Sequence, residues 1–299
     1  MLKKNLGNDK WIVLLLMLPG ILHFLIFKYL PLGGNIIAFQ DYNMFRGIMN
    51  SDWAGFKHFA TIFTYEEFYN VLRNTIIFSF MSILFGFPAP LILALLLNEV
   101  MKMWFKRSLQ TLLYLPHFLS WVIVGGIFIN LLSIDGVLNT LLSFVGIQPI
   151  DFITRPEWFR GVIVSIGIWK SIGWGTIIYL AALAGINPNL YEAAVVDGAG
   201  RWKQMWYVTL PSLMPTVVVL FLLQIGNVLE ANVEQILIFL NPLVRDVGEV
   251  IDTYVYRVGL LNAQFSYTTA IGLFQSIVGL VMVMSLNSLS KKVSGESIY

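Results

Sequence analysis

Polar side chains that could contact a solute are concentrated at the end of one apolar stretch and just beyond it. They are Gln224, Asn227, Glu230, Asn232, Glu234 and Gln235. Amides and carboxylates are costly in lipid and usually face a polar pathway or one another. Asn227 and Glu230 are three residues apart, so a helix would place both on one face. Two interpretations stay open for these residues: they face a polar pathway for a solute, or they form a hydrogen bond between helices, with pairing of Glu230 and Lys170 as one form of it.

Lys170 is the one charged residue in a second apolar stretch, residues 161–186. It could pair with Glu230 or Glu234, meet an anionic solute, or extend its ammonium group to the membrane surface. Trp174 follows on the same stretch. An aromatic face can stack on the C–H surface of a sugar, although tryptophan near a membrane interface more often belongs to an aromatic belt. Both residues are therefore weaker candidates for solute contact.

The sequence shows little that could support catalysis. It has no cysteine, which removes thiolate metal sites, disulfides and cysteine nucleophiles. His23 and His117 lie alone in apolar stretches, where a histidine more often forms a hydrogen bond within a helix bundle than ligates haem. Neither a Gly-x-Ser-x-Gly run nor a Gly-x-x-x-x-Gly-Lys-Ser/Thr run is present. We expect no enzyme, no cofactor or metal on this chain, and no binding of ATP by a P-loop.

The composition is typical of an integral membrane protein. The chain has 299 residues, of which 57% are hydrophobic and only 12% are charged, and its mean hydropathy is +0.75. Soluble domains carry about 25% charged residues, so half that share cannot cover the surface of a soluble protein of this size. Disordered, nucleic-acid-binding and disulfide-stapled secreted proteins are disfavoured. The net charge of +2 says little about partners.

Six apolar stretches are long enough to cross a bilayer, which takes about 20 residues. We expect an all-α membrane protein whose single transmembrane domain covers residues 1–299. The expected spans are about residues 11–30, 74–98, 110–133, 161–186, 212–231 and 268–289. Lys3, Lys4 and Lys10 resemble the start of a signal peptide, but no small-x-small cleavage site follows, so we expect the first span to remain in the protein.

Lysine and arginine near the span ends indicate the orientation, because cytoplasmic loops carry an excess of them. On one side lie Lys3, Lys4, Lys10, Lys102, Lys106, Arg107, Arg201, Lys203, Lys291 and Lys292. On the other, spread over longer loops, lie Arg46, Lys57, Arg73, Arg155, Arg160, Arg245 and Arg257. The first side is therefore expected to be cytoplasmic and to hold both termini. In the first outer loop, residues 56–72 have apolar positions at helical spacing, which predicts a helix at the outer interface.

The inner loop, residues 187–211, predicts two short helices joined by a glycine elbow. Asn189 could cap the first helix, with Glu192 at its third position. Gly198 ends this helix, because glycine reaches left-handed conformations cheaply. A second short helix is expected over about residues 201–209. An element of this kind could transmit force if another protein bound to it.

This loop also resembles the EAA motif, which marks the permease subunits of binding-protein-dependent ABC importers. The residues that match, at the spacing of the motif, are Glu192, Ala193, Ala194, Gly198, Val208, Leu210 and Pro211. Trp169-Lys170 and Gly173-Trp174, ahead of the loop, are similar to the carbohydrate branch that includes the maltose permeases. Residues 234–257, and the final stretch that includes 295–297, look like the LplB/YteP-type oligosaccharide permeases of Gram-positive bacteria. The alternative is an amphipathic helix that rests on the inner leaflet.

The resemblance implies a type I ABC importer permease fold and the partners that go with it. The chain would pair with a second homologous permease subunit and with two ATP-binding cassette subunits, which hold ATP and magnesium. An extracellular solute-binding lipoprotein would deliver a sugar or oligosaccharide at a bacterial plasma membrane. The positions that carry over as coupling residues toward the ATPase are Glu192, Ala193, Ala194, Asp197, Gly198, Leu210 and Pro211.

The resemblance also indicates where the substrate binds. In maltose-type permeases the span after the motif carries asparagines that hold the sugar, so Asn227 and Glu230 are the first candidates for substrate contacts. The others are Glu234, Gln235, Lys170 and Trp174. Glu230 is an acid where a neutral amide is expected, so strict maltose-like recognition is not implied. Two alternatives stay open: an importer subunit for a non-sugar solute, and a self-contained secondary transporter, which would need inverted symmetry or helices broken in both halves.

Overall fold

The computed structural model describes residues 6–293 and is almost entirely helical. Lys3, Lys4 and residues 295–297 lie outside the described residues. Within the described range, six helices are long and apolar enough to cross a membrane. They cover Trp11–Phe39, Glu66–Asn98, Trp121–Ser143, Pro156–Ala184, Arg201–Gly226 and Phe265–Ser288. This agrees with the expectation of an all-α membrane protein.

The chain divides into two compact units. Unit 1 comprises Met1–Tyr65 and Val255–Phe274, and unit 2 comprises Glu66–Tyr254 and Gln275–Tyr299. The boundary falls within the last helix of the described range, α15, whose first residues belong to unit 1 and whose later residues belong to unit 2. The expectation of a single domain over residues 1–299 stays a prediction.

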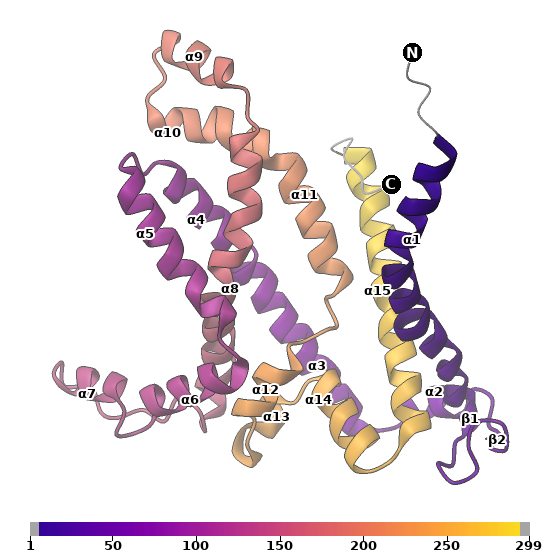
Figure 1. Ribbon diagram of the computed structural model, residues 1–299. Coiled ribbons are helices and arrows are strands. Elements are labelled where there is room, and N and C mark those ends of the chain that lie inside the picture. The colour runs from indigo at the N-terminus through magenta and orange to yellow at the C-terminus, as the bar shows by residue number, and fades with distance from the viewer. Residues whose placement is uncertain (1–5, 294–299) are drawn as a thin grey trace. The chain divides into compact units, whose positions relative to one another are not determined.

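Unit 1 consists of helices and one short β-ribbon. Its elements are α1 (Leu6–Phe24), the π-helical turn η1 (Leu25–Tyr29), the 3-10 helix η2 (Leu30–Phe39), β1 (Gln40–Asp41), β2 (Asp52–Trp53), α2 (Lys57–Ile62), the π-helical η7 (Tyr256–Leu261) and the start of α15 (Phe265–Val293). Strands β1 and β2 pair antiparallel, with Gln40 opposite Trp53 and Asp41 opposite Asp52 (Figure 1). The single interface helix expected over residues 56–72 is instead divided, because α2 ends at Ile62 and the next helix begins only at Glu66.

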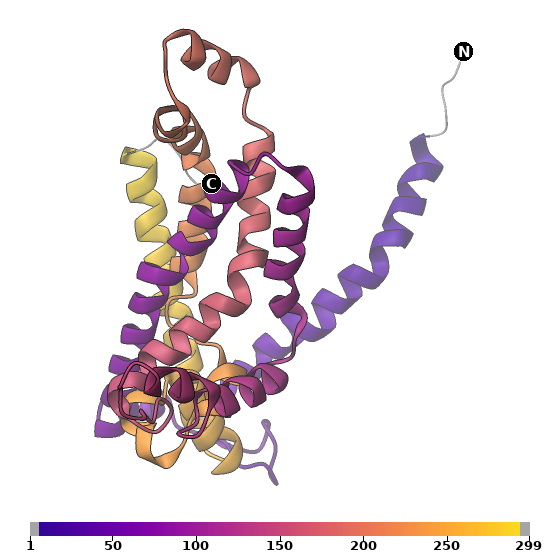
Figure 2. The same ribbon diagram turned by 90° about the vertical axis from the view of Figure 1, so that its left-hand side faces the viewer.

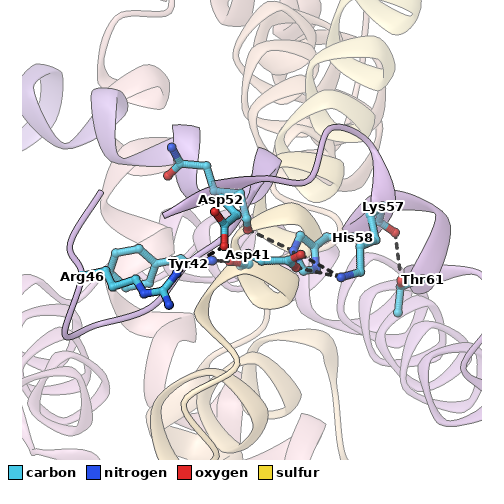
Figure 3. Close-up of polar contacts among 9 residues, drawn as sticks. Asp41, Tyr42, Arg46, Asp52, Lys57, His58 and Thr61 are labelled. Carbon is cyan, nitrogen blue, oxygen red and sulfur yellow. Dashed lines mark hydrogen bonds and ion pairs between the residues drawn. The ribbon is translucent and has the colours of Figure 1, made fainter. Parts of the chain in front are cut away.

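Charged side chains tie the ribbon to α2 (Figure 3). The Lys57 ammonium lies 2.8 Å from Asp41 Oδ2, and His58 Nε2 lies 3.1 Å from Asp41 Oδ1. The hydrogen bond from Lys57 lowers the pKa of Asp41, and the charges of Lys57 and His58 act in the same direction. A longer contact of 3.4 Å joins Arg46 and Asp52. These pairs are partly or largely exposed, so they fix the geometry of the ribbon more than they stabilise it.

Unit 2 holds the remaining elements. They are α3 (Glu66–Met81), the π-helical turn η3 (Ser82–Gly86), α4 (Pro88–Asn98), α5 (Met103–Tyr114), the 3-10 turn η4 (Leu115–Phe118), α6 (Trp121–Leu132), α7 (Val137–Ser143), α8 (Pro156–Ala184), α9 (Pro188–Val196), α10 (Arg201–Gln204), the π-helical turn η5 (Met205–Thr209), α11 (Leu210–Gly226), α12 (Val233–Phe239), the 3-10 turn η6 (Pro242–Val244), α13 (Arg245–Gly248), α14 (Ile251–Val255) and the rest of α15. Helix α8 packs against both α4 and α5 (Figures 1 and 2).

Two glycines on α8 make this packing close. A Cβ placed at Gly173 would lie 2.0 Å from the carbonyl oxygen of Leu113, on α5. A Cβ at Gly175 would lie 2.9 Å from Cγ of Pro90, on α4. Small residues at a helix crossing let two backbones approach, which is how membrane helices commonly gain contact without a hydrophobic driving force. The glycines of α8 therefore set the distance between this helix and its two neighbours.

The third expected span, residues 110–133, is not one helix. Helix α5 passes into η4, Leu119 has an extended backbone with ψ of 140°, and α6 begins at Trp121. Two local features explain the break. Pro116 has no N–H to continue the helical ladder, and the hydroxyl of Ser120 accepts a hydrogen bond from the N–H of Ile123 at 3.3 Å, which caps a new helix.

A buried polar network fixes the segment that contains α13. Arg160, on α8, donates from Nη2 to Asn74 Oδ1 at 2.8 Å and from Nε to the Val247 carbonyl at 3.0 Å. Asn74, on α3, donates in turn to the carbonyls of Asp246 and Glu249 at 2.8 and 3.0 Å. Each of these four hydrogen bonds ends on a main-chain or amide oxygen, so neutral acceptors help to hold the irregular chain around α13.

Candidate functional site

A cavity of about 530 Å³ lies within unit 2. Its walls come from α3, η3, α4, α6, α8, α11, α12 and the segment between α11 and α12. Most of the lining is apolar. The polar lining residues are Ser79, Ser82, Ser171, Gln224, Asn227, Glu230, Asn232 and Gln235, with the rings of Trp121, Trp174 and Tyr179 beside them. A concave site with apolar walls and a few polar groups is the usual form of a small-molecule site.

The segment 227–232 supplies much of the polar lining. Helix α11 ends at Gly226, and Asn227 is its C-cap, with φ of −104° and ψ of 22°. Asn227 and Glu230 therefore do not share a helical face, as the sequence led us to expect, because the helix stops before them. Both nevertheless line the cavity, together with Asn232. Non-helical backbone at membrane depth is tolerated where it lines a cavity or is buried in protein, and this segment fits that rule.

Gln235 and Glu234 have different surroundings. Gln235 lines the cavity, but it is buried and its Nε2 donates to the carbonyl of Ile163 on α8 at 2.6 Å. Glu234 is exposed and lies outside the cavity lining. Both belong to the first turn of α12, which Asn232 caps by accepting a hydrogen bond from the N–H of Gln235 at 3.1 Å. The structure thus brings Gln235 to the cavity and leaves Glu234 away from it.

Lys170 is buried, and its partners differ from those expected. Its Nζ donates to the carbonyl of His117 at 2.9 Å and lies 5.2 Å from the centroid of the Trp121 ring. Among the described residues no ion pair joins it to Glu230 or Glu234, and it does not extend to the surface. Lys170 lies outside the cavity lining. Its charge is balanced by a carbonyl dipole and the face of an aromatic ring.

Two tryptophans form aromatic walls of the cavity. Trp174 stacks on the ring of His117, with centroids 4.4 Å apart and planes 3° apart. Trp121, at the start of α6, also lines the cavity, and sequence reasoning missed it. Ser120 could have indicated it, because serine often caps a helix and therefore predicts a helix start at Trp121 within this apolar stretch.

The loop between α8 and α11 forms two helices, as expected, but with a different start. The side chain of Asn187, and not that of Asn189, caps α9 by accepting a hydrogen bond from the N–H of Asn189 at 3.0 Å. Pro188 takes the first helical position, which needs no N–H donor. Glu192 is consequently the fifth residue of the helix and not the third. Asn187 followed by Pro188 therefore marks the start of this helix, and not Asn189 with Glu192 at the third position.

Helix α9 ends in a Schellman motif. Asp197 is the C-cap, and Gly198 follows with a positive φ of 79°. Gly198 N donates to the carbonyl of Val195 at 3.0 Å, and Ala199 N donates to the carbonyl of Ala194 at 2.8 Å. A Cβ on Gly198 would meet no atom within 4 Å, so the left-handed backbone, and not a lack of space, requires glycine here.

The second helix of the loop continues into the membrane. α10, η5 and α11 form one uninterrupted helical segment, Arg201–Gly226. The expected separate helix over residues 201–209 is therefore the first part of the fifth span. The hydroxyls of Tyr191 and Thr209 lie 3.0 Å apart, and Gln204 Nε2 donates to the carbonyl of Ala199 at 2.8 Å. These contacts join the two arms of the elbow.

The elbow lies at the end of unit 2 opposite to α6, α7, α12 and α13 (Figures 1 and 2). Most residues of the loop that resembles the EAA motif are exposed, so a partner protein could contact them. The exposed residues of the EAA motif region are Glu192, Ala193, Asp197, Gly198 and Pro211, and the half-buried ones are Ala194, Val208 and Leu210. The motif and the cavity thus occupy different parts of one unit. Among the described residues no cluster of three or more His, Asp or Glu side chains could hold a metal ion.

Comparisons with known proteins identify the family. Residues 86–295 match the model of the binding-protein-dependent transport system inner membrane component. The protein LplB of Bacillus subtilis (strain 168) is 47% identical over 98% of this chain and 92% of its own length. The polygalacturonan/rhamnogalacturonan transport system permease protein YteP of the same organism is 49% identical over 95% of this chain and 89% of its own length.

A solved structure is similar over nearly the whole chain. It is the crystal structure of a bacterial ABC transporter involved in the import of the acidic polysaccharide alginate, and the matched chain is 42% identical, with a TM-score of 0.88 over 96% of this chain and 97% of its own. A second structure, of a bacterial alginate ABC transporter in complex with an alginate pentasaccharide-bound periplasmic protein, has the same TM-score. This protein belongs to the family of binding-protein-dependent transport system inner membrane components, the multi-pass permease subunits of ABC importers.

Proposed function

We propose that this chain forms part of the translocation pathway for a sugar or oligosaccharide in an ATP-driven importer. The observation that carries the proposal is the end of α11 at Gly226, which turns Asn227, Glu230 and Asn232 toward the cavity. Helices that break at a central cavity are how transporters place polar groups on a solute pathway. The names of YteP and of the alginate importer support a saccharide substrate.

The lining of the cavity suits a saccharide. Trp121 and Trp174 offer flat apolar faces to the C–H surface of a sugar ring. The amides of Asn227 and Asn232 can donate to and accept from hydroxyl groups, and the Glu230 carboxylate can accept from them. Such a site holds a molecule that is apolar on its faces and polar on its rim. A peptide or polyol importer is the second candidate, which a screen of the delivering protein would reveal.

The partners are a second homologous permease subunit, two ATP-binding cassette subunits and an extracellular solute-binding lipoprotein. The family is binding-protein-dependent, and one similar transporter has been solved with its periplasmic protein. The chain has no P-loop sequence, so ATP and magnesium would be held by the ATPase subunits. The exposed elbow around Glu192 and Gly198 would dock in the ATPase and transmit its closure to α8 and α11.

The elbow bears on the orientation of unit 2. If α9 and α10 meet an ATPase, their end of unit 2 is cytoplasmic, and the distribution of lysine and arginine in the sequence favours the same side for both termini. Arg201 and Lys203 on α10 and Lys102 at the start of α5 support this, because cytoplasmic ends are rich in lysine and arginine. The location is the plasma membrane of a bacterium, in contact with lipid along the apolar helices.

Purification of the tagged chain from native membranes in mild detergent tests this proposal. We expect a second six-helix permease and an ATPase to co-elute, and a binding protein that is then screened against trigalacturonate, an alginate trisaccharide, maltotriose and a tripeptide. The assembled complex in proteoliposomes should accumulate the bound saccharide only with ATP inside and the binding protein outside. A chain that elutes alone from detergent shown to preserve such complexes, and still transports, would contradict the proposal.

A further inference from the structure

The non-helical segment 227–232 is held from outside by side chains of two other helices. Ser79, on α3, donates a hydrogen bond from its hydroxyl to the carbonyl of Val228. Gln275, on α15, donates from Nε2 to the carbonyl of Leu229 at 3.0 Å. Neither carbonyl belongs to a helix that could satisfy it. Because an unpaired carbonyl at membrane depth is costly, these two side chains stabilise the point at which α11 ends.

A third contact holds the following residue. Asp252, on α14, accepts a hydrogen bond at its Oδ2 from the N–H of Ala231 at 2.6 Å. Its other oxygen, Oδ1, accepts from Nε2 of Gln275 at 3.3 Å. Both carboxylate oxygens therefore act as acceptors, which an amide of the same shape cannot do. Burial raises the pKa of the Asp252 carboxyl, while the N–H of Ala231 and the amide of Gln275 act against this rise.

Helix α15 also lies unusually close to the end of α11. A Cβ at Gly279 would lie 2.9 Å from the carbonyl oxygen of Gly226, and a Cβ at Gly226 would lie 2.9 Å from Cγ2 of Val283. The two glycines let the backbones approach, which brings Gln275 within reach of Leu229 one turn further along α15. The hydrogen bonds and the glycine contact thus fix the same short stretch of chain.

We propose that Asp252 and Gln275 are positioning residues that hold Glu230 and Asn232 in the orientation in which they select the solute. This inference rests on the proposed function. Neither side chain lines the cavity, and both act on the main chain at Leu229 and Ala231, directly on either side of Glu230. Loss of either contact frees the main chain next to Glu230, so the carboxylate no longer has a fixed place in the cavity.

The first measurement is amide hydrogen exchange in the assembled importer, which needs no substrate. We expect both Asp252→Asn and the near-isosteric Gln275→Met to speed exchange of the segment 227–232 about tenfold. The first leaves one acceptor for the two donors, Ala231 N and Gln275 Nε2, and the second removes the donor to the Leu229 carbonyl. Asp246→Asn is the matched control, since its carboxylate is exposed on α13 and the change in chemistry is the same. Unchanged exchange in both variants would overturn the positioning role.

The second measurement is a double-mutant cycle on solute selectivity, the ratio of maltotriose to trigalacturonate uptake with each loaded binding protein in excess. This ratio does not depend on how much importer is folded. If Asp252 positions Glu230, Glu230→Gln should change the ratio about fivefold in the wild-type background and less than about twofold in the Asp252→Asn background. An equal change in both backgrounds would overturn the inference. A wild-type importer that moves none of the saccharides that its binding protein binds would contradict the proposed function, while the exchange measurement still decides the positioning role.

Discussion

The ammonium group of Lys170 reaches across from α8 to the main-chain carbonyl of His117, 2.9 Å away, at the point where the chain leaves η4. That carbonyl is free to accept because Leu119 is extended and does not continue the helix. The face of Trp121 covers the charge from another side. A buried cation with a carbonyl and a ring as partners links α8 to the break between α5 and α6.

Replacement of Lys170 by methionine should destabilise this break. The change keeps the length and apolar volume of the side chain but leaves the His117 carbonyl without its donor. We expect a loss of about 1–3 kcal/mol in stability, measured by thermal unfolding of the purified importer in detergent. Lys102→Met, at an exposed lysine, is the control. Equal midpoints for the two variants would show that the buried hydrogen bond contributes nothing.

Gly173→Ala should disturb the crossing of α8 and α5. A methyl group at this position would lie 2.0 Å from the Leu113 carbonyl, so one helix must move. We expect a loss of about 1–3 kcal/mol, seen as a lower yield and a lower unfolding midpoint. Gly161→Ala in the same helix meets no atom within 4 Å and should instead stabilise the helix by about 0.5–1 kcal/mol. The prediction is wrong if both alanines behave alike.

Gly198 should matter for coupling and not for insertion. A large side chain such as tryptophan forces the left-handed position of the elbow to change and places bulk on the exposed face. We expect Gly198→Trp to abolish uptake while the protein still inserts and is purified in normal amounts. Gly200→Trp, with φ of −69° and open space around its Cα, tests whether bulk alone is enough. Normal uptake by the Gly198 variant would refute the coupling role.

Asn227 and Glu230 should act on the solute. Asn227→Ala is expected to lower uptake and substrate-stimulated ATP turnover about tenfold, which corresponds to the loss of about one hydrogen bond to a buried polar group. Glu230→Gln should raise the share of acidic saccharide that is taken up, because Glu230 is the only charged residue among the described residues of the lining. Glu157→Gln, an exposed acid outside the cavity, should change neither quantity. Unaltered transport in both cavity variants would place the solute elsewhere.

The amino-acid sequence predicts those features that depend on composition and local spacing. Long apolar stretches predict the membrane helices, and Gly198 predicts the elbow, because a left-handed residue after a helix is a local requirement. The position of Asn227 at a cavity agrees with the cost of an amide in lipid. The cap on Asn187 was open to prediction as well, since proline at the next position marks a helix start.

Features that depend on main-chain acceptors could not be predicted in the same way. The partner of Lys170 is a carbonyl oxygen, and every residue carries one, so the sequence offers only carboxylates as visible partners. The segment after the end of α11 is contacted at Leu229 and Ala231 by Gln275 and Asp252, which lie on other elements farther along the chain. Long-range geometry decided both of these features. The break at Leu119 differs, because Pro116 and Ser120 are local signals for it that lie within a mostly apolar stretch.

In residues 227–232 the contacts that fix the main-chain path differ from the side chains that line the cavity. Contacts to the main chain from Asp252 and Gln275 fix the path of the segment whatever side chains it carries. The side chains of Asn227 and Glu230 form no hydrogen bond to Asp252 or Gln275, so each can be exchanged while the path of the chain is kept, whereas Asn232 also caps α12. Related importers could therefore diversify toward new solutes by single substitutions, with the same helical architecture inherited unchanged.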